Sequence, residues 1–206
     1  MAKGAAYKVP RRRRREGKTN YYRRYRYILS RAIRFVVRKT NKYILVQVIK
    51  ATPIGDIVIA SAHSRELIKL FGWKAGTKNT PAAYLTGFLA GVRARYMGVE
   101  KAVLDIGLHT PTKGAKVFAA AKGAIDAGLQ IPVNEEMIPT IDRIKGETIA
   151  EYARTLKSSN PEKYQKQFNS IISKGFDPEK IPELFDHVYK NIIQLASKIG
   201  VEVKST

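Results

Sequence analysis

Residues 80–106 read TPAAYLTGFLAGVRARYMGVEKAVLDI, and this stretch indicates the class of fold. Thr80 followed by Pro81 is typical of a helix start, because proline suits the first helical position. We predict a helix that runs to about Met97, ends at Gly98 and leads into a strand at 102–106. One side of this helix carries only small residues, which would let it lie close against a sheet: Ala83, Gly87, Ala90, Gly91 and Ala94.

The segments before this helix read as strands. Residues 35–38 and 43–50 predict a β-hairpin that turns at Thr40-Asn41, and residues 57–60 predict a third strand after the Gly55-Asp56 turn. Both faces of 43–50 are mostly apolar, so this strand should be central and covered. Together with the later helix and strand, the pattern predicts an α/β fold: a central mixed sheet with a hairpin or meander and a βαβ-type crossover.

The positive charge is concentrated at the N-terminus. Residues 1–42 contain sixteen lysines and arginines but a single acid, whereas residues 130–206 contain eleven of each sign. The whole chain has a formal net charge of +21. A cationic arm in front of a balanced body indicates a protein that binds a polyanion.

Two patterns follow one another within this basic region. Arg11–Arg15 should be extended and disordered when alone, because adjacent guanidinium groups repel. Thr19 or Asn20 then caps a predicted helix with arginines largely on its other sides. The apolar positions of this helix are Tyr21, Tyr22, Tyr25, Ile28, Leu29 and Ala32. We expect Tyr25, Ile28 and Leu29 to be core residues, and we leave Tyr21 and Tyr22 open between core and RNA contact.

Tyrosine interleaved with arginine favours RNA over the other polyanions. A membrane-surface helix would need a broad face of large aliphatic residues, which this region lacks. Unstacked RNA bases lie on aromatic or guanidinium planes, and arginine forks chelate phosphate. Duplex DNA, a nuclear-import signal and simple solubility remain alternatives for Arg11–Arg15.

Two further regions are candidates for contact with RNA. The predicted hairpin carries a basic edge and tip, for which ordinary protection of an edge strand is the alternative: Arg34, Arg38, Lys39, Asn41 and Lys42. The loop at 73–80 contains Lys74, Lys78 and the single tryptophan. Trp73 is either an anchor in the core or a stacking platform.

A helix is predicted from Lys113 or Gly114 to Gly128, and its start is rich in hydroxyl and ammonium groups. Thr110, Thr112, Lys113 and Lys116 could hold a phosphate there. Ordinary helix capping is the alternative, because no phosphate-binding glycine motif is present.

The chain divides into three expected parts. Residues 1–19 form the arm, 20–132 an α/β RNA-binding domain, and 133–206 a helical C-terminal extension in which 147–156, 161–173 and 182–199 read as helices.

Catalytic signals are sparse. The three histidines lie far apart, and there is no cysteine, which excludes disulfides and thiolate metal sites. Asp105 with His109 is the one pair that could imitate a nuclease site, although capping of the following loop is the ordinary explanation for Asp105. We predict a soluble, cytosolic protein that is not an enzyme and has no cofactor, metal, small-molecule substrate or membrane partner. A generic basic chaperone is a further alternative.

Five long stretches of the sequence resemble a known family: 7–24, 61–73, 79–94, 102–132 and 146–152. They include YKVPRRRRREGKTNYYRR, SAHSRELIKLFGW, NTPAAYLTGFLAGVRA and GETIAEY. The chain is similar to the archaeal and eukaryotic-type ribosomal proteins of the large subunit that bind 5S ribosomal RNA, the L-eighteen family. After 152 the similarity is looser.

This resemblance implies a non-catalytic ribosomal protein of the central protuberance. Its expected partners are 5S rRNA, 23S-type rRNA and neighbouring large-subunit ribosomal proteins. Transferred to this sequence, the implied RNA contacts in the arm and first helix are Lys8, Arg11, Arg12, Arg13, Arg14, Arg15, Lys18, Tyr21, Tyr22, Arg23, Arg24 and Arg26. The hairpin group follows (Arg34, Arg38, Lys39, Asn41 and Lys42), and then Lys74 and Lys78.

Overall fold

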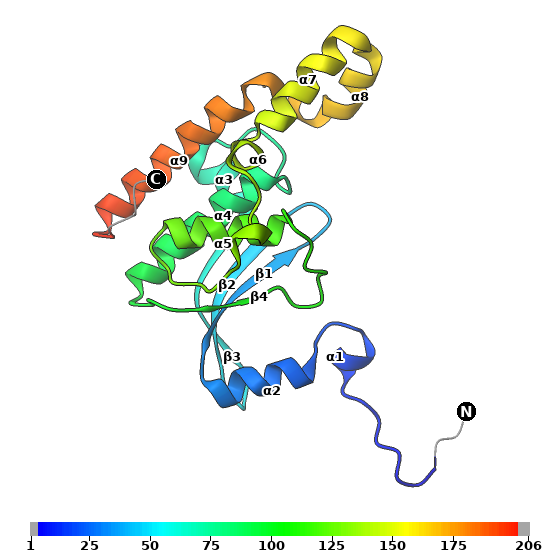
Figure 1. Ribbon diagram of the computed structural model, residues 1–206, viewed down its shortest axis with the longest axis vertical. Coiled ribbons are helices and arrows are strands. Elements are labelled where there is room, and N and C mark those ends of the chain that lie inside the picture. Colours follow the sequence, from blue (N-terminus) through cyan, green and yellow to red (C-terminus); the bar gives the residue numbers. More distant parts are fainter. Residues whose placement is uncertain (1–3, 202–206) are drawn as a thin grey trace.

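A four-stranded mixed sheet lies at the centre of the protein. The computed structural model describes residues 4–201, and Figure 1 shows the sheet between two groups of helices. The strands are β1 (Ile33–Lys39), β2 (Ile44–Ala51), β3 (Asp56–His63) and β4 (Val103–Asp105), in the order β3-β2-β1-β4. β2 is antiparallel to both of its neighbours, and β4 is parallel to β1. The predicted α/β fold, mixed sheet and central position of β2 are therefore confirmed.

Two helices cover one face of the sheet. Helix α4 (Thr80–Tyr96) lies against β2 and β3, and α5 (Lys116–Asp126) packs on α4 and reaches β1. The cap of α4 is Asn79, whose side chain accepts a hydrogen bond from the backbone N–H of Ala82 at 2.9 Å. The predicted cap, Thr80, is instead the first helical residue.

Glycines allow α4 and α5 to approach closely. A Cβ added to Gly87 would overlap the backbone carbonyl of Ala120, and one added to Gly123 would overlap the carbonyl of Tyr84. The predicted small-residue side of α4 is thus a close contact, but its partner is α5 as well as the sheet.

A short helix and a buried tryptophan connect the sheet to α4. Helix α3 (Ser64–Phe71) is capped by His63, whose Nδ1 accepts a hydrogen bond from the N–H of Arg65 at 3.0 Å. Trp73 is fully buried, and its indole N–H donates to the carbonyl of Gly76 at 3.1 Å. Trp73 is therefore a core anchor, and the stacking interpretation is wrong.

The C-terminal third is helical. It contains η1 (Glu135–Met137), α6 (Ile141–Lys145), α7 (Glu147–Ser159), α8 (Pro161–Ile172), η2 (Pro178–Lys180) and α9 (Ile181–Lys198). Phe185 and Tyr189 of α9 pack against the rings of Tyr84 and Phe88 on α4, with centroids 4.8–6.3 Å apart. One hydrophobic core therefore includes the sheet, α4, α5 and α9.

The basic N-terminal region lies at the opposite end of the sheet from α7 and α8 (Figure 1). It contains α1 (Arg12–Arg15) and α2 (Tyr21–Ser30), and neither helix has a buried residue. Part of the predicted extended arm is thus one helical turn, since Glu16 pairs with both Arg12, at 3.1 Å, and Lys18, at 2.8 Å. Within residues 4–201, no helix is long and apolar enough to cross a bilayer.

The close contact of α4 with α5 predicts whether a glycine-to-alanine substitution raises or lowers the stability of the protein. Replacing glycine by alanine in an open helix position adds about 1 kcal/mol of stability. At Gly87 we expect the opposite, a loss of about 1–3 kcal/mol, because the new methyl group must displace the backbone of α5. Chemical denaturation of Gly87→Ala measures it. Gly55→Ala, where a Cβ meets nothing within 4 Å, is the control; a Gly87→Ala protein as stable as this control would contradict the packing.

Candidate nucleic-acid interface

Helix α2 begins at a well-defined cap. The Asn20 side chain accepts hydrogen bonds from the backbone N–H groups of Tyr22, at 3.1 Å, and Arg23, at 3.2 Å. The helix ends at Arg31, whose backbone is left-handed with φ of 52°, and the chain then turns into β1. This geometry places α2 at one end of the sheet (Figure 1), where Arg24 reaches Asp56 at the start of β3 and Arg23 reaches Gly107 after β4.

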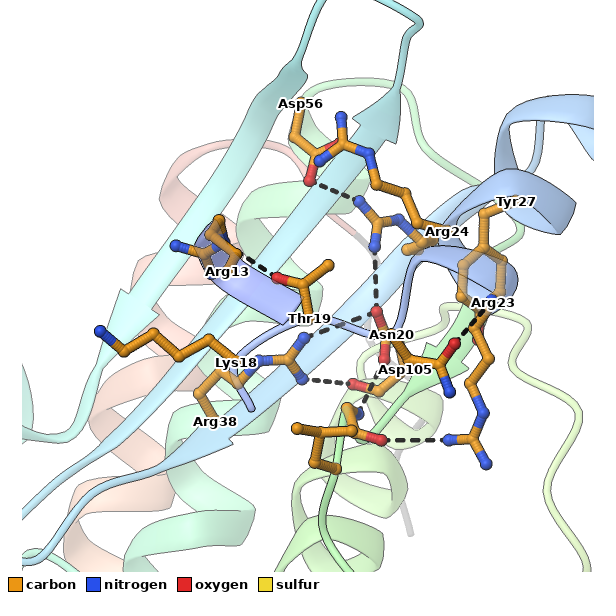
Figure 2. Close-up of a pocket in the computed structure, with 13 residues that line it drawn as sticks. Arg13, Lys18, Thr19, Asn20, Arg23, Arg24, Tyr27, Arg38, Asp56 and Asp105 are labelled. Carbon is orange, nitrogen blue, oxygen red and sulfur yellow. Dashed lines mark hydrogen bonds and ion pairs between the residues drawn. The ribbon is translucent and has the colours of Figure 1, made fainter. Parts of the chain in front are cut away.

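Three arginines and two carboxylates join α2 to the sheet, as Figure 2 shows in part. On α2, Arg24 pairs with Oδ1 of Asp56 at 3.2 Å. On β1, Arg34 bridges Oδ2 of Asp56 at 2.7 Å and Oδ2 of Asp105 at 3.0 Å. Arg38 approaches the same Asp105 oxygen at 3.6 Å. Residues from α2, β1, β3 and β4 therefore form one ionic network.

Arg34 is the centre of this network and is only 5% exposed. Its guanidinium also lies 5.3 Å from the ring centroid of Tyr27, and its Nε is a buried atom without a hydrogen-bond partner. Burial, followed by the nearby charge of Asp105, raises the pKa of Tyr27. The prediction placed Arg34 on the exposed edge of the hairpin. That position is corrected, because two acids hold the side chain against the sheet.

Both carboxylate oxygens of Asp105 accept hydrogen bonds. Besides Arg34 on Oδ2, its Oδ1 accepts from the N–H of Gly107 at 2.8 Å. Arg23 of α2 donates to the carbonyl of the same Gly107 at 3.0 Å. His109 accepts from the backbone N–H of Lys39 at 3.4 Å. The predicted capping of the loop by Asp105 is confirmed, and its carboxylate joins β1 to the loop after β4.

The outer side of α2 is aromatic. Tyr22 is 72% exposed, Tyr25 62% and Leu29 63%, so the predicted core role of Tyr25 and Leu29 is wrong. Ile28 is only partly buried. Arg24 points toward the sheet, where it pairs with Asp56, and Arg23 donates to the carbonyl of Gly107. This orientation turns Tyr22 and Tyr25 toward solvent.

The arm packs on α2 through arginine–aromatic contacts. The guanidinium of Arg11 lies 5.0 Å from the ring centroid of Tyr21, and that of Arg14 lies 5.5 Å from that of Tyr22. Arg13 donates to the hydroxyl of Thr19 at 2.9 Å. A groove forms between arm and helix, and its lining residues include Lys8, Arg11, Arg14, Tyr21 and Tyr25. Of the predicted arm residues, only Arg12 and Lys18 have an acidic partner within residues 4–201.

The hairpin tip forms a second basic surface. Lys39, Asn41 and Lys42 are exposed in the turn between β1 and β2, as predicted from the sequence. The turn is closed by a 2.8 Å hydrogen bond from the N–H of Thr40 to the carbonyl of Tyr43. Lys74 is exposed and Lys78 is partly buried in the following loop. Among the described residues, no group of three acids, histidines or cysteines could hold a metal ion.

The Arg34 network predicts a stability change. Arg34→Leu would leave Asp105 as a buried charge with only the more distant Arg38, so we expect a loss of about 3 kcal/mol or more. Urea denaturation measures it. Arg26→Leu is the matched control, because Arg26 is exposed and should change stability by about 0.5 kcal/mol at most. Equal losses in the two variants would contradict the anchoring role of Arg34.

Comparison with known proteins identifies the family. The family described as "Ribosomal large subunit proteins 60S L5, and 50S L18" matches residues 5–97 and 94–134. The large ribosomal subunit protein uL18 of Staphylothermus marinus is 58% identical over 194 residues, which cover 94% of this chain and 96% of the relative. The uL18 proteins of Ignicoccus hospitalis and Saccharolobus solfataricus are each 57% identical, covering 94% and 93% of this chain and 95% and 96% of the relatives. The chain therefore belongs to the uL18 family of structural proteins of the large ribosomal subunit.

Proposed function

We propose that this protein binds 5S rRNA and helps to attach it to the large-subunit rRNA in the central protuberance. One observation carries the proposal: Asp56 neutralises Arg24 and the carbonyl of Gly107 binds Arg23, while the arm cations and two tyrosines of α2 stay exposed. Exposed tyrosine beside uncompensated arginine is the chemistry that RNA recognition uses.

The two parts of this surface would act differently. Arm cations, among them Arg11, Arg14 and Arg15, have no acidic partner in the described chain and would contact phosphates without regard to sequence. Tyr22 and Tyr25 stand on a helix whose position is set by the buried network, so they offer stacking platforms at defined places. Shape and splayed bases would give specificity, because the A-form major groove is closed to side chains.

The network also determines which predicted residues act directly. Arg23, Arg24 and Arg38 are bonded to Gly107, Asp56 and Asp105, so their first role is to position α2 and the loop after β4. Arg34 acts only through these partners, because it is buried. The exposed Arg26, Lys39, Asn41, Lys42 and Lys74 remain proposed direct contacts.

The rival function is an RNA-cleaving or RNA-modifying enzyme that uses Asp105 and His109. Asp105 is only 6% exposed and its carboxylate binds Arg34 and the N–H of Gly107, which favours a structural role over that of a general base. We therefore propose a non-enzymatic scaffold. The further partners we propose are 23S-type rRNA and neighbouring large-subunit proteins, within the cytoplasmic ribosome.

A competition assay separates recognition from charge. Replacing Tyr22 and Tyr25 together by alanine should weaken binding to 5S rRNA by about tenfold or more, since each stacked base contributes about 1–3 kcal/mol. Binding to a tRNA competitor should change little. Changing Arg11–Arg15 to glutamine should weaken the binding of both RNAs similarly, because phosphate contacts do not read sequence. Filter binding at fixed salt measures the affinity of each of the two variants for 5S rRNA and for tRNA, relative to the unmodified protein.

Tyr96→Ala is the control for this assay, because Tyr96 is 63% exposed at the end of α4, away from α2. An unmodified protein that binds 5S rRNA and tRNA equally would favour a generic basic chaperone. Equal losses on both RNAs for the tyrosine variant would show that α2 does not recognise the RNA.

A further inference from the structure

A groove lies where the hairpin tip meets the start of α5. Its walls come from four separate places in the chain: the end of β1 and the turn after it, the loop before α4, the segment that leads into α5, and α6. Figure 1 shows the β1–β2 turn beside the loop that enters α5. The groove has a volume of about 530 Å³, and its basic lining residues are Lys39, Lys78, Lys113, Lys116 and Arg143.

Four of these cations have no neutralising partner. Lys113 pairs with Glu136 at 2.9 Å. In contrast, the side chains of Lys39, Lys78, Lys116 and Arg143 form no ion pair or hydrogen bond within residues 4–201. In contrast to these four cations, Arg24 and Arg34 between α2 and the sheet form ion pairs with Asp56 and Asp105. The groove thus collects positive charge that the folded chain leaves unbalanced.

The unbalanced positive charge of the groove affects the pKa of Lys116. Burial lowers the pKa of its ammonium group, and the neighbouring charges of Lys78, Lys39 and Arg143 lower this pKa further. An anion placed among these groups would relieve their mutual repulsion. It would thereby offset the lowering of the Lys116 pKa by the three neighbouring cations.

The first turn of α5 adds to the same field. Within the described part of the chain no side chain caps this helix, so the predicted capping by the threonines before it is wrong. Its free N–H groups and the positive end of its dipole lie beside Lys116, its first residue. Gly114 has φ of +68° and allows close approach, because a Cβ there would lie 3.0 Å from Nη1 of Arg143.

We propose that this groove is a second binding site for the RNA phosphodiester backbone, in which Lys116 and Arg143 act together with Lys39 and Lys78. The inference rests on the RNA-binding function proposed above and adds two contact residues from α5 and α6. The groove is open and wide, and it contains no aromatic ring to stack a base or nucleoside. Its chemistry therefore fits phosphates of a strand that passes over it.

The position of the groove makes it independent of α2. Strand β1 runs from the end of α2 to Lys39, and six residue steps of a strand span about 20 Å. The two sites would therefore hold phosphates several nucleotides apart, or on two neighbouring segments of folded RNA. Two separated contacts would constrain the orientation of the protein on its RNA more than the contact at the arm and α2 alone.

The salt dependence of RNA binding tests the second site. The full chain would be compared with a variant in which Lys39, Lys78, Lys116 and Arg143 are all glutamine, in filter binding to 5S rRNA at several salt concentrations. We expect the slope of log K against log salt to become shallower by about 3, and affinity to fall by about tenfold or more. The matched control changes Lys163, Lys166, Lys174 and Lys190 to glutamine, four exposed lysines of α8, α9 and the loop between them that have no ion pair in the described chain.

Each outcome bears on one claim. A groove variant with the slope and affinity of the control variant would overturn the second site while the unmodified chain still bound 5S rRNA. If the unmodified chain failed to bind RNA, the proposed function itself would fall. Titration with inorganic phosphate, monitored by NMR of the Lys116 amide, tests for a site that binds only small anions. If phosphate shifts the Lys116 signal but the groove variant binds RNA as tightly as the unmodified chain, the groove is a small-anion site and the proposed backbone site is refuted. Circular dichroism of each variant verifies folding.

Discussion

Two carboxylates control how the basic end of this protein is arranged. Asp56 on β3 and Asp105 on β4 are joined through the buried Arg34, and they also hold Arg24 of α2 and Arg38 of β1. Burying a guanidinium is costly unless acids and hydrogen bonds compensate it. The network therefore fixes the orientation of α2, with Arg24 turned inward and Tyr22 and Tyr25 turned outward. Loss of the network would release both the helix and the arm that precedes it.

The same network separates two classes of cation. Those next to the sheet are neutralised within the fold and serve architecture. Those on the arm have few acidic neighbours, because residues 1–42 contain a single acid, Glu16. Around the groove at Lys116, only Lys113 pairs with an acid within the described chain. A charge distribution of this kind is unfavourable for the isolated chain and becomes favourable when phosphates approach and counterions are released. The uL18 relatives are large-subunit ribosomal proteins, in keeping with this asymmetry.

Local sequence patterns predicted most of the fold. Turn residues and apolar alternation located the hairpin, and Thr80-Pro81 with Gly98 bounded α4 to within about two residues. Prediction failed where the partner is distant in sequence. Tyr25 and Leu29 look like a core stripe because apolar spacing alone cannot reveal that Asp56 binds Arg24 and the carbonyl of Gly107 binds Arg23. Arg143 in the groove was missed for the same reason, because only the fold brings α6 to the hairpin tip.

The central claim is that RNA phosphates neutralise the cations that the fold leaves uncompensated. The salt dependence of 5S rRNA binding by the unmodified chain tests it most directly. If about eight cations meet phosphates, log K should fall against log salt with a slope of about −6 to −7. A slope shallower than about −2 would mean that these cations stay in solvent when RNA binds, and would contradict the account.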